Sequence, residues 1–227
     1  MSARADLEAL AAAVAAGKTS FNADMELLRR SVDPATARPA AVLILFGVLD
    51  DRPADFSADA VPDDLDVLLI ERAATLSDHP GQVAFPGGSV DAADATAVDA
   101  ALREAQEETG LDPAGVRVLG ELPAIGLPVS NFLVSPVLGW WDKPTPVDVV
   151  DYGESASVFR VPVADLLNPE NRRTAVLPGR KGAPRTPAFL VGGVLVWGFT
   201  GIILSSVLDE LGWTQPWDET REVVPEL

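Results

Sequence analysis

Three glutamates carry the strongest chemical signal in the sequence: Glu104, Glu107 and Glu108 stand at i, i+3 and i+4. On a helix, this spacing places their carboxylates on one face within a single turn. Like charges at that spacing repel one another, and an ordinary solvated face would intersperse lysine among them. Carboxylate oxygens are the ligands that Mg²⁺ and Mn²⁺ prefer, with waters and substrate phosphates completing the shell. A divalent-metal site is one interpretation, and an idle, solvated acidic face is the alternative.

A glycine turn lies ahead of these glutamates. Pro86-Gly87-Gly88 allows a sharp turn and a close approach of the backbone to another group. The segment 95–109 has a helical composition, and Gly110 follows it as a natural helix stop. A tight turn at a fixed distance before an acidic helix favours the metal-site interpretation.

Composition limits the remaining chemistry. The chain has 227 residues, of which 48% are apolar, so it can form a sizeable core in one domain with or without appendages. Cysteine is absent, which excludes disulfide scaffolds, thiol nucleophiles and cysteine-ligated metals. His79 is the only histidine, so a multi-histidine metal site is excluded as well. The formal charge of −17 repels nucleic acids and anionic membranes, and a phosphorylated substrate would need divalent cations to bridge it to such a chain.

Two apolar segments raise the question of export or membrane insertion. In segment 1–17, acidic residues precede an alanine-rich stretch, which is typical of an amphipathic helix and not of a signal peptide. Segment 186–208 carries no charge, but a proline and several glycines interrupt it. The pattern there predicts a hairpin closed by Gly192-Gly193, followed by a helix over 201–211. We therefore expect a cytoplasmic protein without a membrane partner.

The elements that must position the acidic helix form an α/β pattern. Helices are predicted at 4–32 (one or two), 95–109 and 201–211, and strands at 41–49, 66–71, 116–122, 132–140, 156–161 and 174–177. Many strands with one internal and one closing helix indicate a mixed α/β sandwich around a curved sheet. We divide the chain into an N-terminal helical extension (1–37), a main domain (38–212) and a C-terminal tail (213–227).

The segment 88–111 resembles the Nudix box, G-x5-E-x7-R-E-U-x-E-E-x-G-U, in which U is a bulky aliphatic residue. Gly88 stands at the opening glycine. The second half of the motif is matched by Arg103, Glu104, Glu107, Glu108, Gly110 and Leu111. Ala105 replaces a bulky aliphatic residue. Asp94 replaces the first glutamate, and eight residues instead of seven separate it from Arg103.

This departure in the first half is a mark of one branch of the family. Segment 68–88, LLIERAATLSDHPGQVAFPGG, resembles the coenzyme A pyrophosphatase signature LLTxR-[SA]-xxx-R-xxx-G-xxx-FPGG. That branch also has the aspartate and the longer spacing. Ile70 stands in place of the threonine, and Ser77 in place of the second arginine. With further similarities downstream, the resemblance covers about residues 38–212.

The resemblance implies a Nudix-type α/β/α sandwich around a mixed, curved sheet, and attack of water on a diphosphate linked to a nucleoside. It implies that Glu104 and Glu108 hold Mg²⁺ or Mn²⁺, with Glu107 as a further ligand or the base. Arg103 is then a residue that pairs with Asp94 or a box glutamate and fixes the loop against the helix. A surface ion pair between Arg103 and Glu107 is the alternative.

Further site candidates lie outside the second half of the box. Glu154 is a candidate for a distant carboxylate at the metal site or for the base, with a solvated loop residue as the alternative. Arg72, at the end of a strand, is a candidate contact for a substrate phosphate, with a surface ion pair as the alternative. Gly87 and Gly88 are assigned to substrate binding through their backbone.

The single histidine and three tryptophans are also within the resembling region. His79 lies between turn residues, which predicts a loop residue and not a catalytic one. Burial in the core is expected for Trp140, Trp141 and Trp197, with stacking on an adenine as the alternative.

Three functions remain open from the sequence. The first is a CoA or acyl-CoA pyrophosphatase that yields 4′-phosphopantetheine (or its acyl form) and adenosine 3′,5′-bisphosphate. The second is a Nudix pyrophosphatase for ADP-ribose, a dinucleotide or an oxidised nucleoside triphosphate. The third is a Nudix-fold binding module without catalysis, against which the intact glutamates argue. The signature at 68–88 favours the first. The expected partner is a small nucleotide-containing molecule, no nucleic-acid partner is expected, and a homodimer is left open.

Overall fold

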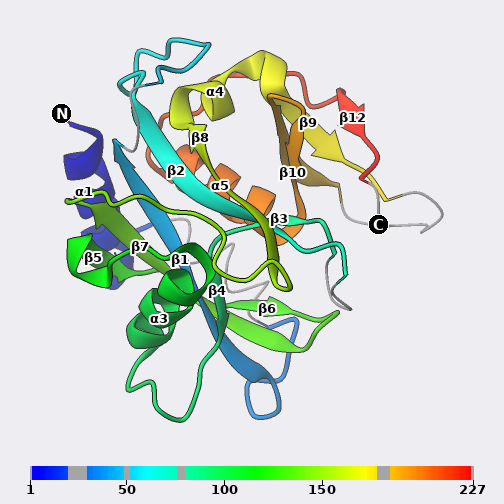
Figure 1. Ribbon diagram of the computed structural model, residues 1–227. Coiled ribbons are helices and arrows are strands. Elements are labelled where there is room, and N and C mark those ends of the chain that lie inside the picture. The colour runs from blue at the N-terminus through cyan, green and yellow to red at the C-terminus, as the bar shows by residue number, and fades with distance from the viewer. Residues whose placement is uncertain (1, 20–29, 49–51, 76–79, 178–184, 226–227) are drawn as a thin grey trace.

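The computed structural model describes residues 2–19, 30–48, 52–75, 80–177 and 185–225 (Figure 1). Its centre is a mixed sheet in the order β3-β2-β1-β7-β5, in which β1 (Arg38–Val48) and β7 (Phe132–Trp141) run parallel. The other strands of this order are β2 (Leu65–Arg72), β3 (Val83–Ala84) and β5 (Val116–Glu121). Three more strands pair with it, namely β4 (Gly87–Ser89) with β1, β6 (Ile125–Leu127) with β7, and β8 (Ser155–Pro162) with β2.

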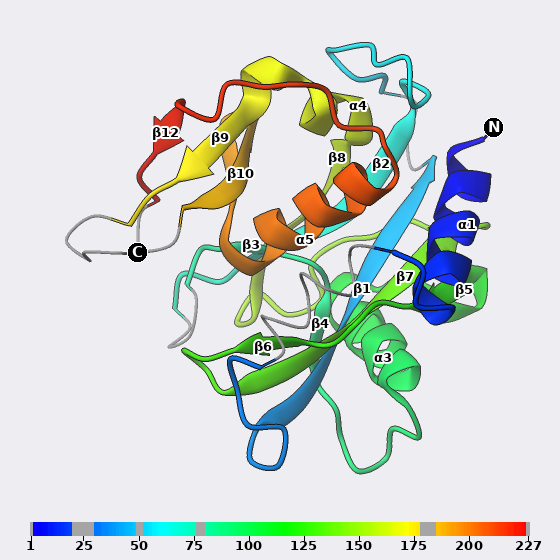
Figure 2. The ribbon, with the colours of Figure 1, turned by 180° about the vertical axis from the view of Figure 1, so that it is seen from behind.

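Helices cover both faces of this sheet, as the two opposite views show (Figures 1 and 2). α3 (Ala97–Thr109) lies on one face and α5 (Gly198–Glu210) on the other, while α1 (Ala3–Ala15) packs beside β5. Successive side chains of β1 point to opposite faces. Leu43 therefore joins the apolar cluster under α3, and its neighbour Ile44 joins the cluster that includes α5. The predicted α/β/α sandwich around a mixed sheet is confirmed.

A smaller sheet, in the order β11-β10-β9-β12, is built from the C-terminal part of the chain. It consists of β9 (Arg172–Ala175), β10 (Thr186–Val191), β11 (Val194–Val196) and β12 (Glu222–Val223), and the short helix α4 (Val163–Leu167) precedes it. The predicted hairpin is confirmed, because β10 and β11 pair antiparallel across Gly192-Gly193. Across the described ranges, no helix is long and apolar enough to cross a membrane.

The observed bounds differ from the predicted ones by a few residues. α3 begins two residues later than predicted, because Thr96 is its N-cap. α5 begins at Gly198, three residues before the predicted start, and β9 covers 172–175 where 174–177 was predicted. Of the helical region predicted at 4–32, α1 is described, and residues 20–29 lie outside the described ranges.

Both ends of the chain contribute to the packed structure. Leu7 of α1 and Trp213 beyond α5 belong to the same buried cluster as the α5 side of the sheet. Further on, β12 pairs in parallel with β9. The division into extension, main domain and tail stays a prediction.

Candidate active site

The acidic helix α3 is held at both ends by local hydrogen bonds. The Thr96 hydroxyl accepts from the Asp99 amide (3.2 Å) and donates to the Asp99 carboxylate (2.8 Å), which satisfies one amide at the helix start. At the other end, Gly110 adopts a left-handed conformation (φ 70°), and its amide donates to the Gln106 carbonyl (2.8 Å). The face on the sheet is made of fully buried small residues, Ala100, Ala101 and Ala105. The polar side chains of α3 therefore lie on its other faces.

Arg103 is the centre of this polar surface. Its Nε and Nη2 donate to the two carboxylate oxygens of Asp94 (3.0 and 2.9 Å), and Nη2 also donates to the Ser89 carbonyl (3.0 Å). Its Nη1 donates to Glu104 (3.0 Å) and to Glu107 (2.9 Å). The hydrogen bond from Arg103 holds the pKa of Asp94 below its ordinary value. Arg103 thus ties the preceding loop to the helix, and it makes both of the contacts that the sequence left as alternatives.

Glu108 is the most buried carboxylate of the helix, with 5% of its area exposed. Its Oε2 accepts a hydrogen bond from the amide of Gly87 (2.8 Å). Burial raises the pKa of Glu108 to about 8. The carboxylates of Glu104 and Glu154 raise it further, whereas the Gly87 amide and the charge of Arg72 lower it. The charged form of Glu108 is therefore poorly compensated by the chain itself, and a bound cation would compensate it.

The two glycines of the turn allow two different close contacts. Gly87 has a φ of 155°, and a Cβ at this position would lie 2.3 Å from the carbonyl oxygen of Ala41. A Cβ at Gly88 would lie 2.5 Å from the Cδ atom of Glu104. Both glycines belong to β4, and its pairing with β1 presents the Gly87 amide to Glu108. The turn is a backbone surface packed directly against two of the three glutamates.

Arg72 and Glu154 reach the same place from two paired strands. Arg72 ends β2, Glu154 precedes β8, and the Ala73 amide donates to the Glu154 carbonyl (2.9 Å). Both charges act on the pKa of Glu108. The Nε of Arg72 is buried and has no hydrogen-bond partner among the described residues. A buried donor without a partner is costly, so this nitrogen is a position where an anionic ligand would be stabilising.

Glu107 differs from Glu104 in its exposure, although both carboxylates accept from the Nη1 of Arg103. Its side chain is 57% exposed and bonded to Arg103, whereas that of Glu104 is 18% exposed. Within the described part of the chain, no three Asp, Glu or His side chains converge as a ready metal site. Mg²⁺ is usually held by one or two carboxylates plus waters and substrate phosphates. Glu104 and Glu108 fit that requirement, and Glu107 is a more exposed carboxylate beside Glu104.

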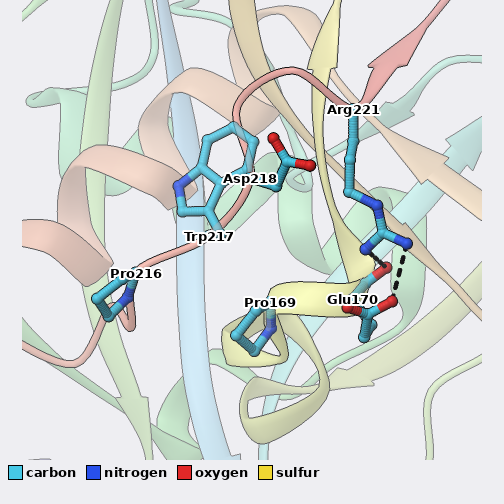
Figure 3. Close-up of a pocket in the computed structure, with 6 residues that line it drawn as sticks. All are labelled: Pro169, Glu170, Pro216, Trp217, Asp218 and Arg221. Atoms are coloured by element: carbon cyan, nitrogen blue, oxygen red, sulfur yellow. Dashed lines mark hydrogen bonds and ion pairs between the residues drawn. The ribbon is translucent and has the colours of Figure 1, made fainter.

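A separate hollow of about 550 Å³ lies by the smaller sheet (Figure 3). It is lined by Pro169, Glu170, Pro216, Trp217, Asp218 and Arg221. Arg221 forms an ion pair with Glu170 (2.8 Å), as the close-up shows. Two carboxylates and one paired arginine do not suit a diphosphate, and no predicted site residue lies in this hollow. We therefore place the candidate site at α3 and the glycine turn.

Several sequence-based candidates have other outcomes. Ser77 and His79 lie outside the described residues. Trp141 is buried, as expected, and Trp140 packs half-buried against the core. Trp197 is half-buried at the start of α5. The sequence gives no sign of the Ser89 carbonyl as a partner of Arg103, because a backbone acceptor has no residue-type signature.

The site thus combines desolvated carboxylates on a helix with a glycine turn and an arginine. These residue types suit an enzyme that acts on phosphate groups. A family model described as NUDIX domain matches residues 54–174, a region that contains α3, the turn, Arg72 and Glu154. The chain belongs to the Nudix family and is a hydrolase acting on pyrophosphate bonds. Nudix hydrolases act on small nucleotide-derived substrates and generally use divalent metal ions such as Mg²⁺ or Mn²⁺.

Two relatives agree with this family, and one solved structure is similar to this chain. The chain is 36% identical over 194 residues to the uncharacterized Nudix hydrolase NudL of Citrobacter koseri, which covers 85% of this chain and 93% of that protein. It is 39% identical over 146 residues to NudL of Cronobacter sakazakii, covering 64% and 75% of the two chains. A solved structure, the Nudix hydrolase RenU of M. smegmatis, is 26% identical, with a TM-score of 0.38 and coverage of 56% and 71%. The NudL names specify no substrate.

Proposed function

We propose that this chain is a metal-dependent hydrolase that cleaves the diphosphate of coenzyme A or acyl-CoA, yielding 4′-phosphopantetheine (or its acyl form) and adenosine 3′,5′-bisphosphate. Arg72 carries this proposal. It is the arginine of the signature at 68–88, its buried Nε has no partner among the described residues, and its charge acts on Glu108 of the Nudix box. A guanidinium matches the geometry of a phosphate. A diphosphate would accept from Arg72 on one side and contact a divalent cation held by the carboxylates of α3 on the other.

Glu104 and Glu108 would hold Mg²⁺ or Mn²⁺. Burial raises the pKa of both carboxyl groups, and the Gly87 amide bonds to only one oxygen of Glu108. Desolvated oxygen ligands suit a hard divalent cation, and the charge of Glu108 in particular is poorly compensated by the chain. When bound, the cation would neutralise charge on the phosphates and lower the pKa of the attacking water.

The other residues of the site position these groups and move the proton. Arg103 holds Glu104 on one side and Asp94 on the other, so it keeps the loop and the helix in register. Glu107 and Glu154 are the candidates for the general base. Glu107 is engaged by Arg103, whereas the Glu154 carboxylate has no hydrogen-bond partner among the described residues. We therefore assign Glu154 as the general base that accepts a proton from the attacking water.

The preference for CoA is supported by the signature and by electrostatics. A chain of charge −17 has no general attraction for a polyanion, so a few local cations such as Arg72 must select the substrate. CoA carries a 3′-phosphate in addition to its diphosphate. We therefore expect dephospho-CoA to be the poorer substrate.

Product analysis tests this function. The protein is incubated with Mg²⁺ or Mn²⁺ and with CoA, ADP-ribose, NADH or a nucleoside triphosphate, and products are identified by mass. We expect the highest kcat/KM for CoA, no hydrolysis after chelation, and a near-total loss in Glu108→Gln. Glu121→Gln, which changes an exposed glutamate at the end of β5, is the matched control and should keep full activity. Faster cleavage of ADP-ribose or a nucleoside triphosphate would refute the CoA assignment and leave the family intact.

A further inference from the structure

We propose that Tyr152 is the surface on which the nucleobase of the substrate stacks. This role rests on the proposed function, because it assumes that a nucleotide diphosphate binds between Arg72 and α3. Tyr152 is the only tyrosine in the chain. It lies in the loop between β7 and β8, outside the Nudix box and outside the signature at 68–88.

The loop that carries Tyr152 is fastened on both sides to the candidate site. Before it, the Val150 amide donates to the Glu108 carbonyl at the end of α3 (3.4 Å). After it, the Glu154 carbonyl accepts from the Ala73 amide, directly beyond β2 (2.9 Å). Two residues of chain span at most about 7 Å. The Cα atom of Tyr152 therefore lies within about that distance of both Val150 and Glu154, at the margin of the site.

The Tyr152 side chain is uncovered. It is 71% exposed, and it has no hydrogen-bond or ring partner among the described residues. The loop itself is ordered by Asp151, whose carboxylate accepts from the Gly153 amide (2.7 Å) and whose carbonyl accepts from the Ser155 amide (3.0 Å). An aromatic side chain gains by covering its faces with apolar or planar groups. Beside a nucleotide site, a free ring on an ordered loop offers such a face to a base.

The other aromatic residues do not offer this surface. Trp141 is buried, Trp140 packs against the core, and Trp197 is half-buried at the start of α5. Trp217 contacts Arg172 by the smaller sheet, with 4.9 Å between its ring centroid and the guanidinium carbon. Of the aromatic side chains in the described ranges, Tyr152 is the one with a largely exposed area. Adenine stacking was the alternative role of the tryptophans in the sequence analysis. We assign that role to Tyr152 instead.

The charges of the loop favour the base over the phosphates at this position. Asp148 and Asp151 precede Tyr152, and no lysine or arginine lies between positions 148 and 154. Phosphates are repelled there and are attracted to Arg72 and the metals, whereas a neutral base is not repelled. Stacking is tolerant of base identity, since every base has a π-face. Tyr152 would thus stack on adenine in CoA and on any other nucleobase that binds in the site.

A binding experiment tests this role without any hydrolysis. Protein labelled with ring-¹³C tyrosine gives the signals of Tyr152 alone, because there is no other tyrosine. It is titrated, with Mg²⁺ present, with AMP and with ribose 5-phosphate, which lacks the base. We expect a saturable upfield shift of the ring signals with AMP and none with ribose 5-phosphate. No shift at saturating AMP, or equal shifts with both ligands, would overturn the role. Nucleotide binding without hydrolysis would instead contradict the proposed function alone.

Steady-state kinetics on CoA provide the second test. Stacking of one base is worth about 5- to 150-fold in affinity, so Tyr152→Ala should raise KM on the order of 10-fold with kcat nearly unchanged. Tyr152→Phe keeps the ring and should restore most of the affinity. Val224→Ala, which removes another exposed apolar side chain, is the control and should leave KM unchanged. An unchanged KM in Tyr152→Ala, or a fall in kcat alone, would assign the loop a merely structural role.

Discussion

Replacing Glu108 by glutamine should remove a large pH dependence from the stability of the metal-free protein. Burial raises the pKa of this carboxyl group from its ordinary 4.5 to about 8. The folded state therefore binds the proton more tightly than the unfolded state. Its contribution to stability is fully present below about pH 4.5 and is lost as the pH rises through about 8. The two pKa values differ by an amount that corresponds to about 5 kcal/mol of unfolding free energy.

Glutamine carries no charge and can still accept the hydrogen bond from Gly87, so Glu108→Gln avoids this loss. Thermal unfolding in chelator should give similar midpoints for the wild type and the variant near pH 5. Near pH 9 the variant should melt about 10–20 °C higher, given about 2–4 °C per kcal/mol for a chain of this size. Added Mg²⁺ should then stabilise the wild type and hardly change the variant. A midpoint difference that is the same at both pH values, or equal Mg²⁺ shifts, would refute the reasoning.

Further variants separate the other parts of the site. Arg103→Ala should lower kcat/KM by about 10- to 100-fold, because residues that orient metal ligands have effects of this size; initial rates at saturating Mg²⁺ measure it, and an undiminished rate would contradict it. Gly88→Ala should displace the Glu104 carboxylate, so titration calorimetry should show weaker Mg²⁺ binding with little change in melting temperature. In Gly87→Ala the added methyl group meets backbone atoms, so the melting temperature should fall sharply. The reverse pattern would show that the two contacts are misassigned. Arg72→Ala should raise KM for CoA by about 10-fold or more, since a charge-assisted hydrogen bond is worth about 1.5–3 kcal/mol; equal KM values would remove Arg72 from the substrate site.

The acidic helix was the most predictable part of the molecule. Its composition, its glycine stop at Gly110 and its small alanine face are local features, and all are present in α3. Its start was placed two residues early, because Thr96 forms a cap with Asp99 that the helical composition of the segment concealed. Local patterns thus predict an element better than they predict its first residue.

The parts that could not be predicted depend on contacts between distant segments. Pro86-Gly87-Gly88 was interpreted as a turn because proline and glycine favour turns, yet Gly87–Ser89 pairs with β1 as β4. The spacing of the three glutamates places them on one side of the helix. It does not reveal that Arg103, oriented by Asp94 and Ser89, would bond both Glu104 and Glu107.

Pairing of β2 with β8 is a further non-local contact that shapes the site. It brings Arg72 and Glu154 together although more than eighty positions separate them in the sequence. β9 begins two residues before its predicted start, and this difference also depends on contacts between distant segments. Arg172, a charged residue that the sequence did not place in a strand, is buried in β9 and contacts the rings of Phe189 (4.5 Å) and Trp217 (4.9 Å).

Anomalous diffraction from crystals of the protein with Mn²⁺ tests the assignment of the site most directly. Manganese is itself the scatterer, so its position is read without reference to activity. We expect an anomalous peak roughly 2.0–2.3 Å from carboxylate oxygens of both Glu104 and Glu108, close to the Gly87–Gly88 turn. The peak should vanish in Glu108→Gln and persist in Glu121→Gln. A peak elsewhere on the chain, with none at α3 under saturating Mn²⁺, would contradict the placement of the metal and of the reaction.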